Sequence, residues 1–264
     1  MIYALFTDET NQQPAQHAQF FIYGGMFLPV ERLPDLHTLV EGARRDNGFR
    51  PADELKFEIH SRPPHVSEAQ HRAAKRSILE GCANLDVRFI AYLTLHRIAA
   101  TRTHTEVIGW GLNSVLGAFN RFLADGNDYG VCIVDRLPFD QGYNFLKEKF
   151  QIGMTFPGGV TRRLDRIHLF AASTLGAGHA LSVIDIVLGA FRYCVNERRP
   201  GREVPRALFP TILSMMWHRT EGGNRVFREY GLLMRPQVVR NPSHAREYLA
   251  LRRHLAGLLP RSVR

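Results

Sequence analysis

Runs of apolar residues alternate with amphipathic stretches along the chain up to about residue 200. Short runs rich in aliphatic, β-branched and aromatic residues, bounded by glycine, proline or polar residues, are typical of strands. Longer stretches with apolar residues every three or four positions are typical of helices. This pattern predicts strands at 2–8, 18–28, 87–95, 130–135 and 167–171, and helices at 30–45, 68–84, 104–123, 139–150 and 179–197.

The order of these elements predicts an α/β fold. Two strands joined by a polar loop at 10–17 come first, and Gly24-Gly25 is expected to bend or bulge the second of them. The later strands are separated by helices, which provide the crossovers that parallel strands need. A short antiparallel meander followed by helical crossovers is the ribonuclease H-like layout, a mixed sheet flanked by helices.

The pattern changes after Pro205. A helix is predicted at 208–218, a turn at 221–224, an extended segment at 230–236 and a basic helix at 243–259. An Arg-rich loop near Pro200-Gly201 is the weakest boundary in the chain. With 264 residues and 45% hydrophobic content, the chain is large enough for a substantial core. We therefore predict one domain, with a core at 1–200 and a C-terminal helical extension at 201–264 packed on it.

Four acidic residues stand among apolar neighbours. Asp8 ends the first strand, Asp135 ends the fourth, Asp185 lies within the most apolar helix, and Glu54 belongs to an irregular segment. A carboxylate in an apolar setting is costly to bury alone, and a shared cation lowers that cost for several of them at once. Because carboxylate oxygens are hard ligands, we expect this cation to be Mg²⁺ or Mn²⁺.

The predicted topology brings three of these carboxylates together. The first and fourth strands are neighbours in this layout, so Asp8 and Asp135 are expected to lie close to each other. The helix at 179–197 would add Asp185, which lies on the same side as its apolar stripe. Side chains alternate along a strand, so Glu9 is expected to point away from Asp8.

The segment from Glu54 to His60 alternates polar and apolar residues. If it is extended, Glu54, Lys56, Glu58 and His60 point to one side and the three apolar residues to the other. Glu54 would then bind metal while Lys56 meets a phosphate. The candidate catalytic residues are Asp8, Glu54, Asp135, Asp185 and Lys56, with the four carboxylates as metal ligands.

Several short motifs, taken in order, resemble the bacterial and phage family known as domain of unknown function 3800. They are Asp8-Glu9-Thr10, Gly24-Gly25, Glu54-Leu55-Lys56, Asp135 after an apolar strand, Ser173 to Gly189 with Asp185, and Tyr230-Gly231-Leu232 through Arg235-Pro236. The resemblance covers nearly the whole chain and implies a ribonuclease H-like fold with a metal-dependent, nuclease-like centre. Two departures concern the surroundings of the ligands: Thr10-Asn11 replaces the usual Ser-Gly, and Ser182 and Ile184 replace Gln and Ala.

The basic composition predicts a polyanionic partner. Lys and Arg number 34 against 25 Asp and Glu, which gives a net charge of +9. We expect Arg162, Arg163 and Arg166 to contact the phosphates of DNA or RNA, because arginine makes bidentate, sequence-independent phosphate contacts. An anionic membrane is the rival partner.

No apolar run approaches the roughly 20 residues of a membrane span, and the first residues lack signal-peptide features. We therefore expect a cytoplasmic protein.

Cysteine and histidine usage agrees with this location and with a hard metal. Cys82, Cys132 and Cys194 are odd in number and widely spaced, and we interpret them as buried thiols in a reducing compartment. The twelve histidines form no His-Glu-x-x-His motif, and the chain has no Cys-x-x-Cys pair. A zinc site is therefore not indicated.

These observations favour a metal-dependent nuclease that hydrolyses phosphodiester bonds of DNA or RNA by a two-metal mechanism. Two alternatives stay open. One is a non-catalytic nucleic-acid-binding or assembly protein on the same fold, which the departures at Ser182 and Ile184 favour. The other is a phosphohydrolase that acts on a small substrate. The sequence does not choose between DNA and RNA, between endo- and exonucleolytic cleavage, or between a monomer, a homodimer and a complex with a partner protein.

Overall fold

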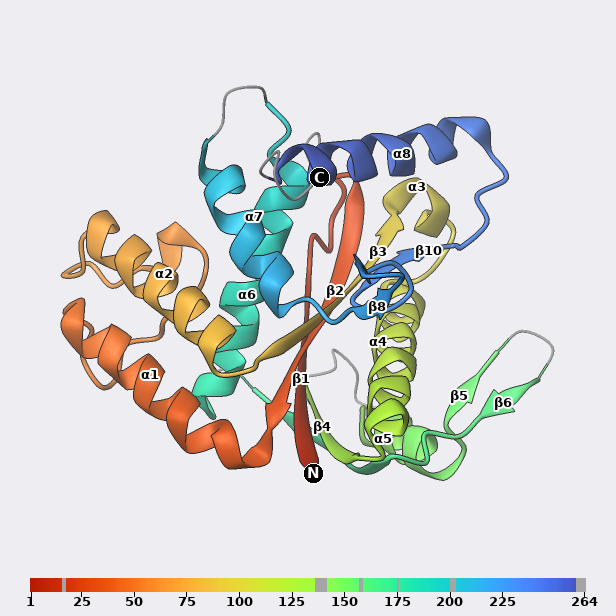
Figure 1. Cartoon of the computed structure of the whole chain (residues 1–264), viewed down its shortest axis with the longest axis horizontal. Coiled ribbons are helices and arrows are strands. Elements are labelled where there is room, and N and C mark those ends of the chain that lie inside the picture. The colour runs from red at the N-terminus through yellow and green to blue at the C-terminus, as the bar shows by residue number, and fades with distance from the viewer. Residues whose placement is uncertain (16–17, 136–141, 157–158, 175, 200–202, 260–264) are drawn as a thin grey trace.

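A mixed six-stranded sheet forms the centre of the molecule (Figure 1). The computed structural model describes residues 1–15, 18–135, 142–156, 159–174, 176–199 and 203–259. The strands are, in spatial order, β10 (Leu232–Arg235), β3 (Arg88–Leu95), β2 (Phe20–Pro29), β1 (Ile2–Thr10), β4 (Tyr129–Asp135) and β7 (Ile167–Ser173). β2 is antiparallel to both β1 and β3, whereas the pairs β1–β4, β4–β7 and β3–β10 are parallel. The predicted α/β fold with a mixed sheet is confirmed.

Helices cover both faces of this sheet. One face carries α1 (Leu33–Asp46), α2 (Glu68–Asn84), α6 (His179–Asn196) and α7 (Glu203–Met215), and the other carries α4 (His104–Gly126) and α5 (Gly142–Gln151). α8 (Pro242–Gly257) contacts α6 and lies across one end of the sheet, near the short helix α3 (His96–Ala99). Each face has its own cluster of buried apolar side chains, so the sheet separates two cores.

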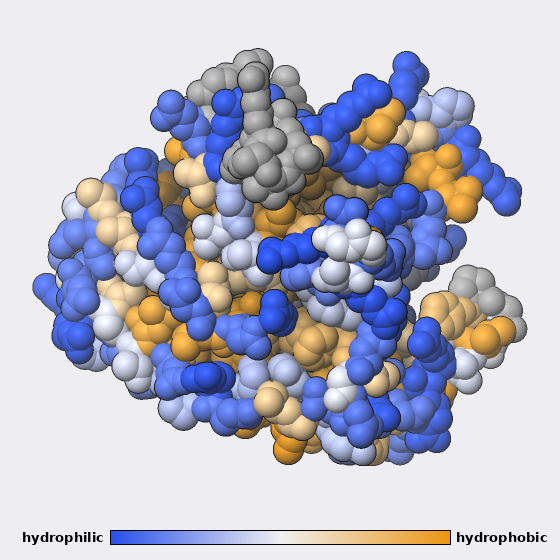
Figure 2. Space-filling view, viewed as in Figure 1, coloured by the Kyte–Doolittle hydropathy of each residue, from blue (hydrophilic) through white to orange (hydrophobic). Residues whose placement is uncertain are grey.

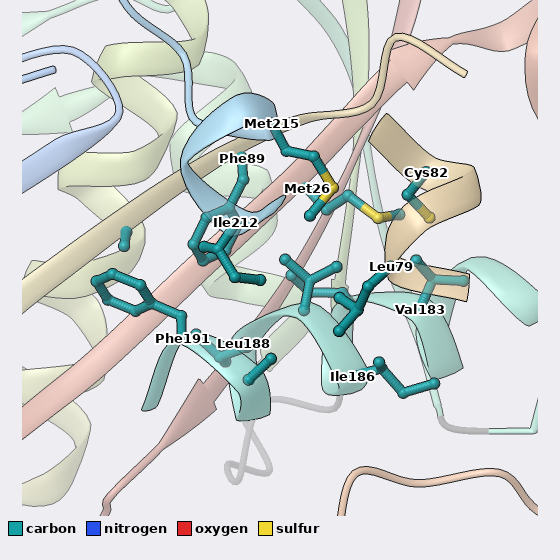
Figure 3. Packing of buried hydrophobic residues seen from close by; sticks show 14 of the residues in the cluster. Met26, Leu79, Cys82, Phe89, Val183, Ile186, Leu188, Phe191, Ile212 and Met215 are labelled. Carbon is teal, nitrogen blue, oxygen red and sulfur yellow. The ribbon is translucent and has the colours of Figure 1, made fainter. Parts of the chain in front are cut away.

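The larger core lies between the sheet and the helices α1, α2, α6 and α7. Figure 3 shows Met26 and Phe89 of the sheet beside Ile212 and Met215 of α7, with Phe191 of α6 next to them. All three cysteines are buried and form no disulfide, as predicted. Burial of these side chains fixes α6 against the sheet, which matters for the position of Asp185.

Gly24 and Gly25 lie in the fully buried strand β2, and they form no bulge there. The pairing register of β2 with both neighbouring strands is continuous, so the predicted bulge is wrong. The glycines instead leave space for the helices. A Cβ at Gly24 would lie 2.6 Å from Leu188 Cδ1 of α6, and one at Gly25 would lie 2.6 Å from Val115 Cγ1 of α4. The pair therefore allows two helices to approach opposite faces of one strand.

Side-chain caps set the starts of three helices. Ser67 and Thr103 each form a capping box, in which the hydroxyl accepts a backbone N–H and a Gln or Glu three residues later accepts in return. Asn241 caps α8 in a related way. The predicted start of α2 at residue 68 is confirmed. At the other end of α4, Asn127 takes a left-handed conformation and terminates the helix.

The second half of the chain differs from the prediction in several details. α7 begins at Glu203 rather than 208, and it includes Pro210. Prolines at 205 and 210 hide this helix in the sequence, because proline removes a backbone donor. Two short hairpins were not predicted: β5 (Met154–Thr155) with β6 (Thr161–Arg162), and β8 (Arg219–Glu221) with β9 (Asn224–Val226). Residues 16–17 of the first loop, residues 139–141 of the helix predicted at 139–150 and the Pro200-Gly201 boundary lie outside the described residues.

The C-terminal part of the chain contributes directly to the sheet. β10 pairs with β3, and Tyr248 of α8 accepts a hydrogen bond from the Leu95 N–H at 2.9 Å and donates one to the Arg235 carbonyl at 2.5 Å. These bonds connect α8, β3 and β10. Among the described residues, the structure contains no helix that is both long enough and apolar enough to span a membrane.

Candidate functional site

Asp8 and Asp135 each follow the last paired residue of the β1–β4 ladder. β1 itself continues past Asp8 to Thr10, two residues beyond the predicted end of this strand. β1 and β4 are parallel neighbours, with Thr7 paired to Val134, and the two aspartates are the next residues on their strands. The predicted adjacency of the first and fourth strands is confirmed. Since side chains alternate along a strand, Asp8 lies on the same face as Phe6, which belongs to the core beneath α6. The carboxylates therefore project from the sheet toward the α6 side.

Helix α6 brings Asp185 to these two aspartates. Gly24 is paired with Asp8 in the β1–β2 ladder, and Leu188 of α6 occupies the space above this glycine. Asp185 precedes Leu188 by three residues, about one helical turn, and therefore lies on the same side of the helix. Close packing at Gly24 thus sets the height of α6 above the sheet, and with it the position of Asp185.

The three aspartates and Glu9 interact electrostatically. Burial, together with the charges of Glu9, Asp185 and Asp135, raises the pKa of Asp8 to about 8, although the Glu9 N–H donates a hydrogen bond to Asp8 Oδ1 at 2.8 Å. Burial and the charge of Asp135 raise the pKa of Glu9 to about 7. Burial also raises the pKa of Asp185, against the opposing effects of the Phe57 N–H, Lys56 and Arg192. Glu9 was expected to point away, yet its charge still reaches Asp8.

Glu54 has a different partner. Its carboxylate lies 3.0 Å from Lys56 Nζ, and Lys56 in turn lowers the pKa of Asp185. The predicted extended run forms no strand, and the chain enters a 3₁₀ turn, η2, at Ile59–Ser61. Glu54 therefore joins the site through Lys56, on a segment that contacts α6 at Asp185 and Gly189.

The Glu54 segment is attached to α6 at Phe57. The Phe57 N–H donates to Asp185 Oδ2 at 2.6 Å, and the Phe57 carbonyl accepts from Lys75 Nζ at 2.6 Å. The Phe57 ring packs on Gly189, where a Cβ would lie 2.6 Å from Phe57 Cδ1. One residue therefore restricts rotation of the Asp185 carboxylate and connects it to α2.

A second attachment comes from His71 of α2. This fully buried side chain lies with Nε2 3.0 Å from the Lys56 carbonyl, so the Nε2–H donates to it, while Nδ1 has no hydrogen-bond partner in the described part of the structure. Burial and the nearby charge of Lys75 lower the pKa of His71 to about 4. The neutral imidazole therefore holds the segment that carries Lys56.

We expect the free energy of unfolding to decrease as the pH is lowered, because His71 is buried in its neutral form. The folded chain binds a proton at His71 less readily than the unfolded chain, so stability is lost as pH falls from 6.5 toward about 4. The loss between pH 7.5 and pH 5 is about 2 kcal/mol for this group. Urea unfolding of the wild type and of His71→Phe at both pH values measures it: the variant should be less stable at pH 7.5 but lose less on acidification. The control is His60→Gln, which alters an exposed histidine. If His71→Phe lost as much stability on acidification as the wild type or as His60→Gln, this role of His71 would be ruled out.

Of the three arginines predicted to contact nucleic acid, Arg162, Arg163 and Arg166, the last lies far from the carboxylates. Arg166 directly precedes β7, whereas Asp135 is paired with Ser173 at the other end of that strand, roughly 20 Å away. Arg163 forms an ion pair with Asp165 at 3.3 Å, and the Arg166 guanidinium donates to Asn127 Oδ1 at 2.9 Å. The structure therefore does not bring Arg166 and the aspartates into one site.

Sequence reasoning missed the residues that support the site: Phe57, Lys75, Gly189 and Arg192. Gly189 was the one available signal, because a glycine inside an apolar helix indicates a close approach by another segment. The others act through contacts between α2, α6 and residues 57–59, which depend on the tertiary fold and leave no local pattern.

The candidate site is recognised by its carboxylates and their shared charge, and not by a preformed metal-coordination geometry. In the described part of the chain, no three His, Cys, Asp or Glu side chains are arranged closely enough to hold a metal ion as they stand. No protein-family model matches the chain, and no curated protein matches it either. The resemblance to the domain of unknown function 3800 family therefore stays a prediction.

Proposed function

We propose that the chain is a Mg²⁺- or Mn²⁺-dependent nuclease with a ribonuclease H-like fold that cleaves phosphodiester bonds of DNA or RNA. One observation carries this proposal: Asp8, Asp135 and Asp185 come from three separate elements, and Asp135 and Asp185 both raise the pKa of Asp8. The antiparallel order β3-β2-β1, continued by the parallel strands β4 and β7, supports the fold assignment.

The donor set fits a hard divalent cation. Asp8, Asp135 and Asp185 offer only carboxylate oxygens, which Mg²⁺ and Mn²⁺ prefer. Burial and the neighbouring carboxylates make the charge of Asp8 unfavourable without a cation, as its pKa of about 8 indicates. These three residues would hold the metal, and Glu54 would join them through a shift of its exposed side chain. When bound, a pair of such ions activates a water and stabilises the leaving oxygen of a phosphodiester.

Protein groups beside the carboxylates would position the substrate. The Phe57 N–H holds Asp185 Oδ2 and so limits the orientations of this ligand. Lys56 lies between Glu54 and Asp185, where its ammonium would meet a phosphate oxygen of the strand. Arg192 of α6 also lowers the pKa of Asp185 and is a second cation near this carboxylate. The site therefore combines a negative centre with positive groups for the flanking phosphates.

The test is a cleavage assay on four labelled substrates: single- and double-stranded DNA and RNA. Each is incubated with Mn²⁺, with Mg²⁺ and with chelator, and Asp185→Asn serves as the site variant. We expect cleavage of at least one polymer that needs the metal and is lost in the variant. Cleavage that persists in chelator or in Asp185→Asn would contradict the proposal.

The same experiment separates the alternatives. Intact polymers with a salt-sensitive mobility shift would instead indicate a binding or assembly protein, because phosphate contacts release counterions. Hydrolysis of nucleotides without cleavage of any polymer would indicate a phosphohydrolase for small substrates. Either result overturns the nuclease assignment.

A further inference from the structure

A groove of about 710 Å³ lies beside the carboxylates, between α2, α6 and α7. Its floor includes Leu79 of α2 and Leu208 of α7, and the half-exposed Val204 lies on its rim. Phe57 and Ile59 also line it. Figure 2 shows a ridge of hydrophilic side chains over α2, with more hydrophobic residues between this ridge and the centre of the molecule. The groove therefore has an apolar base and a polar edge.

The edge of this groove is strongly cationic. It carries Arg72, Lys75 and Arg76 from α2 and Arg192 from α6, and the acidic group among its lining residues is Glu58. Glu58 forms an ion pair with Arg192, and Arg72 pairs with Glu68 at 3.0 Å. In the described part of the chain, Arg76 has no ion pair. The groove therefore has cationic capacity left for an anionic ligand.

Phe57 connects the groove to the carboxylates. Its N–H binds Asp185, while its ring lies in the groove, 4.4 Å from Lys75 Nζ. Arg192 follows Asp185 by seven residues, two helical turns or about 10 Å along the same side of α6. A strand cleaved at the carboxylates and running along α6 would place a neighbouring nucleotide here. The volume is within the usual range of about 300–1,000 Å³ for ligand sites.

We infer that this cationic groove binds one nucleotide of a single-stranded nucleic acid, next to the scissile phosphate. The base would lie on the apolar floor at Leu79 and Leu208, and the phosphate would contact Lys75 and Arg76. Single strands fit best, because a duplex hides the base faces that such a floor requires. This inference rests on the proposed nuclease function, since it assigns the carboxylates as the cleavage point.

Charge reversal at Arg76 tests the groove. Binding of a labelled 12-nucleotide single strand is measured by fluorescence anisotropy in chelator for the wild type, Arg76→Glu and the control Arg97→Glu, which alters an exposed arginine on α3. We expect Arg76→Glu to raise Kd about tenfold and to reduce the salt slope by about one. Arg97→Glu should stay within about twofold of the wild type. Equal Kd values for the two variants would overturn the inference.

Photo-crosslinking provides an independent localisation. Val204→p-benzoylphenylalanine places a reactive group at the groove rim, and the same change at the exposed Val238 is the control. We expect the single strand to crosslink at position 204 and not at 238. Preferential crosslinking at 238, or displacement of the strand by duplex or by an acidic peptide at equal concentration, would overturn the inference.

Failure of the groove and failure of the nuclease are distinguishable. If the wild type cleaves with Mn²⁺ but Arg76→Glu binds like the wild type, the groove assignment fails and the nuclease stands. If Arg76→Glu weakens binding but no polymer is cleaved, the groove stands as a binding site and the nuclease assignment fails.

Discussion

The Asp8→Asn variant is expected to lose at least about 10³-fold of the metal-dependent cleavage rate while its metal-free form becomes more stable than the wild type. The loss of activity would follow from removal of a charged oxygen ligand of the proposed metal site. The gain in stability follows from removal of a charge that the folded chain disfavours. A lower cleavage rate together with a higher stability of the metal-free protein would show that Asp8 has a functional role and not a structural one.

The stability gain has a definite pH range. The folded chain holds the Asp8 proton more tightly than the unfolded chain, because burial and the neighbouring carboxylates raise the pKa from 3.8 to about 8. Ionisation of Asp8 therefore lowers stability progressively as pH rises through this range. At pH 8 in chelator, Asp8→Asn should be more stable than the wild type by about 1–2 kcal/mol. Urea unfolding measures this difference.

Added metal and a matched variant complete the test of Asp8. Millimolar Mn²⁺ should stabilise the wild type and leave Asp8→Asn nearly unchanged, since binding to the folded state raises its stability. Asp46→Asn removes an exposed aspartate at the end of α1 and should change neither cleavage nor the response to Mn²⁺. A metal-free Asp8→Asn protein that is less stable than the wild type would show that the carboxylate supports the fold instead.

The sequence was sufficient for the parts of the fold that depend on local patterns. The strand that carries Asp8, the strand that ends at Asp135 and the helix that carries Asp185 all have clear periodicity, and their order predicts the parallel pairing of β1 with β4. Pairing of these strands places two aspartates at one edge. Residue type and element order therefore led to the core of the candidate site.

The surroundings of the site depend on packing between elements distant in sequence. Gly24 looked like a bend because glycine weakens strands, yet its effect is to admit Leu188. The run after Glu54 alternates as a strand would, but the segment pairs with no strand and is held by His71, Lys75 and α6 instead. Local periodicity does not contain these contacts, so they required the three-dimensional structure.

Gly189→Ala is expected to destabilise the chain and to impair the site, although alanine is a better helix former than glycine. The added Cβ would overlap the Phe57 ring, at 2.6 Å from Cδ1, so the loop must move away from α6. Overpacking of this kind costs about 1–3 kcal/mol, and the helix propensity returns only about 0.5–1 kcal/mol. Movement of Phe57 also removes its hydrogen bond to Asp185, for which we expect about a tenfold lower cleavage rate.

The control for this change is Gly109→Ala in α4. A Cβ at Gly109 meets no atom within 4 Å, so this variant has the propensity gain without the overlap and should be more stable by about 0.5–1 kcal/mol. Urea unfolding and cleavage assays on both variants give the comparison. If Gly189→Ala were as stable and as active as Gly109→Ala, contact between Phe57 and α6 could not be what positions Asp185. If Gly189→Ala is destabilised while Gly109→Ala is stabilised, then the absence of a side chain at position 189 is required both for the fold of residues 54–58 and for the geometry of the carboxylates.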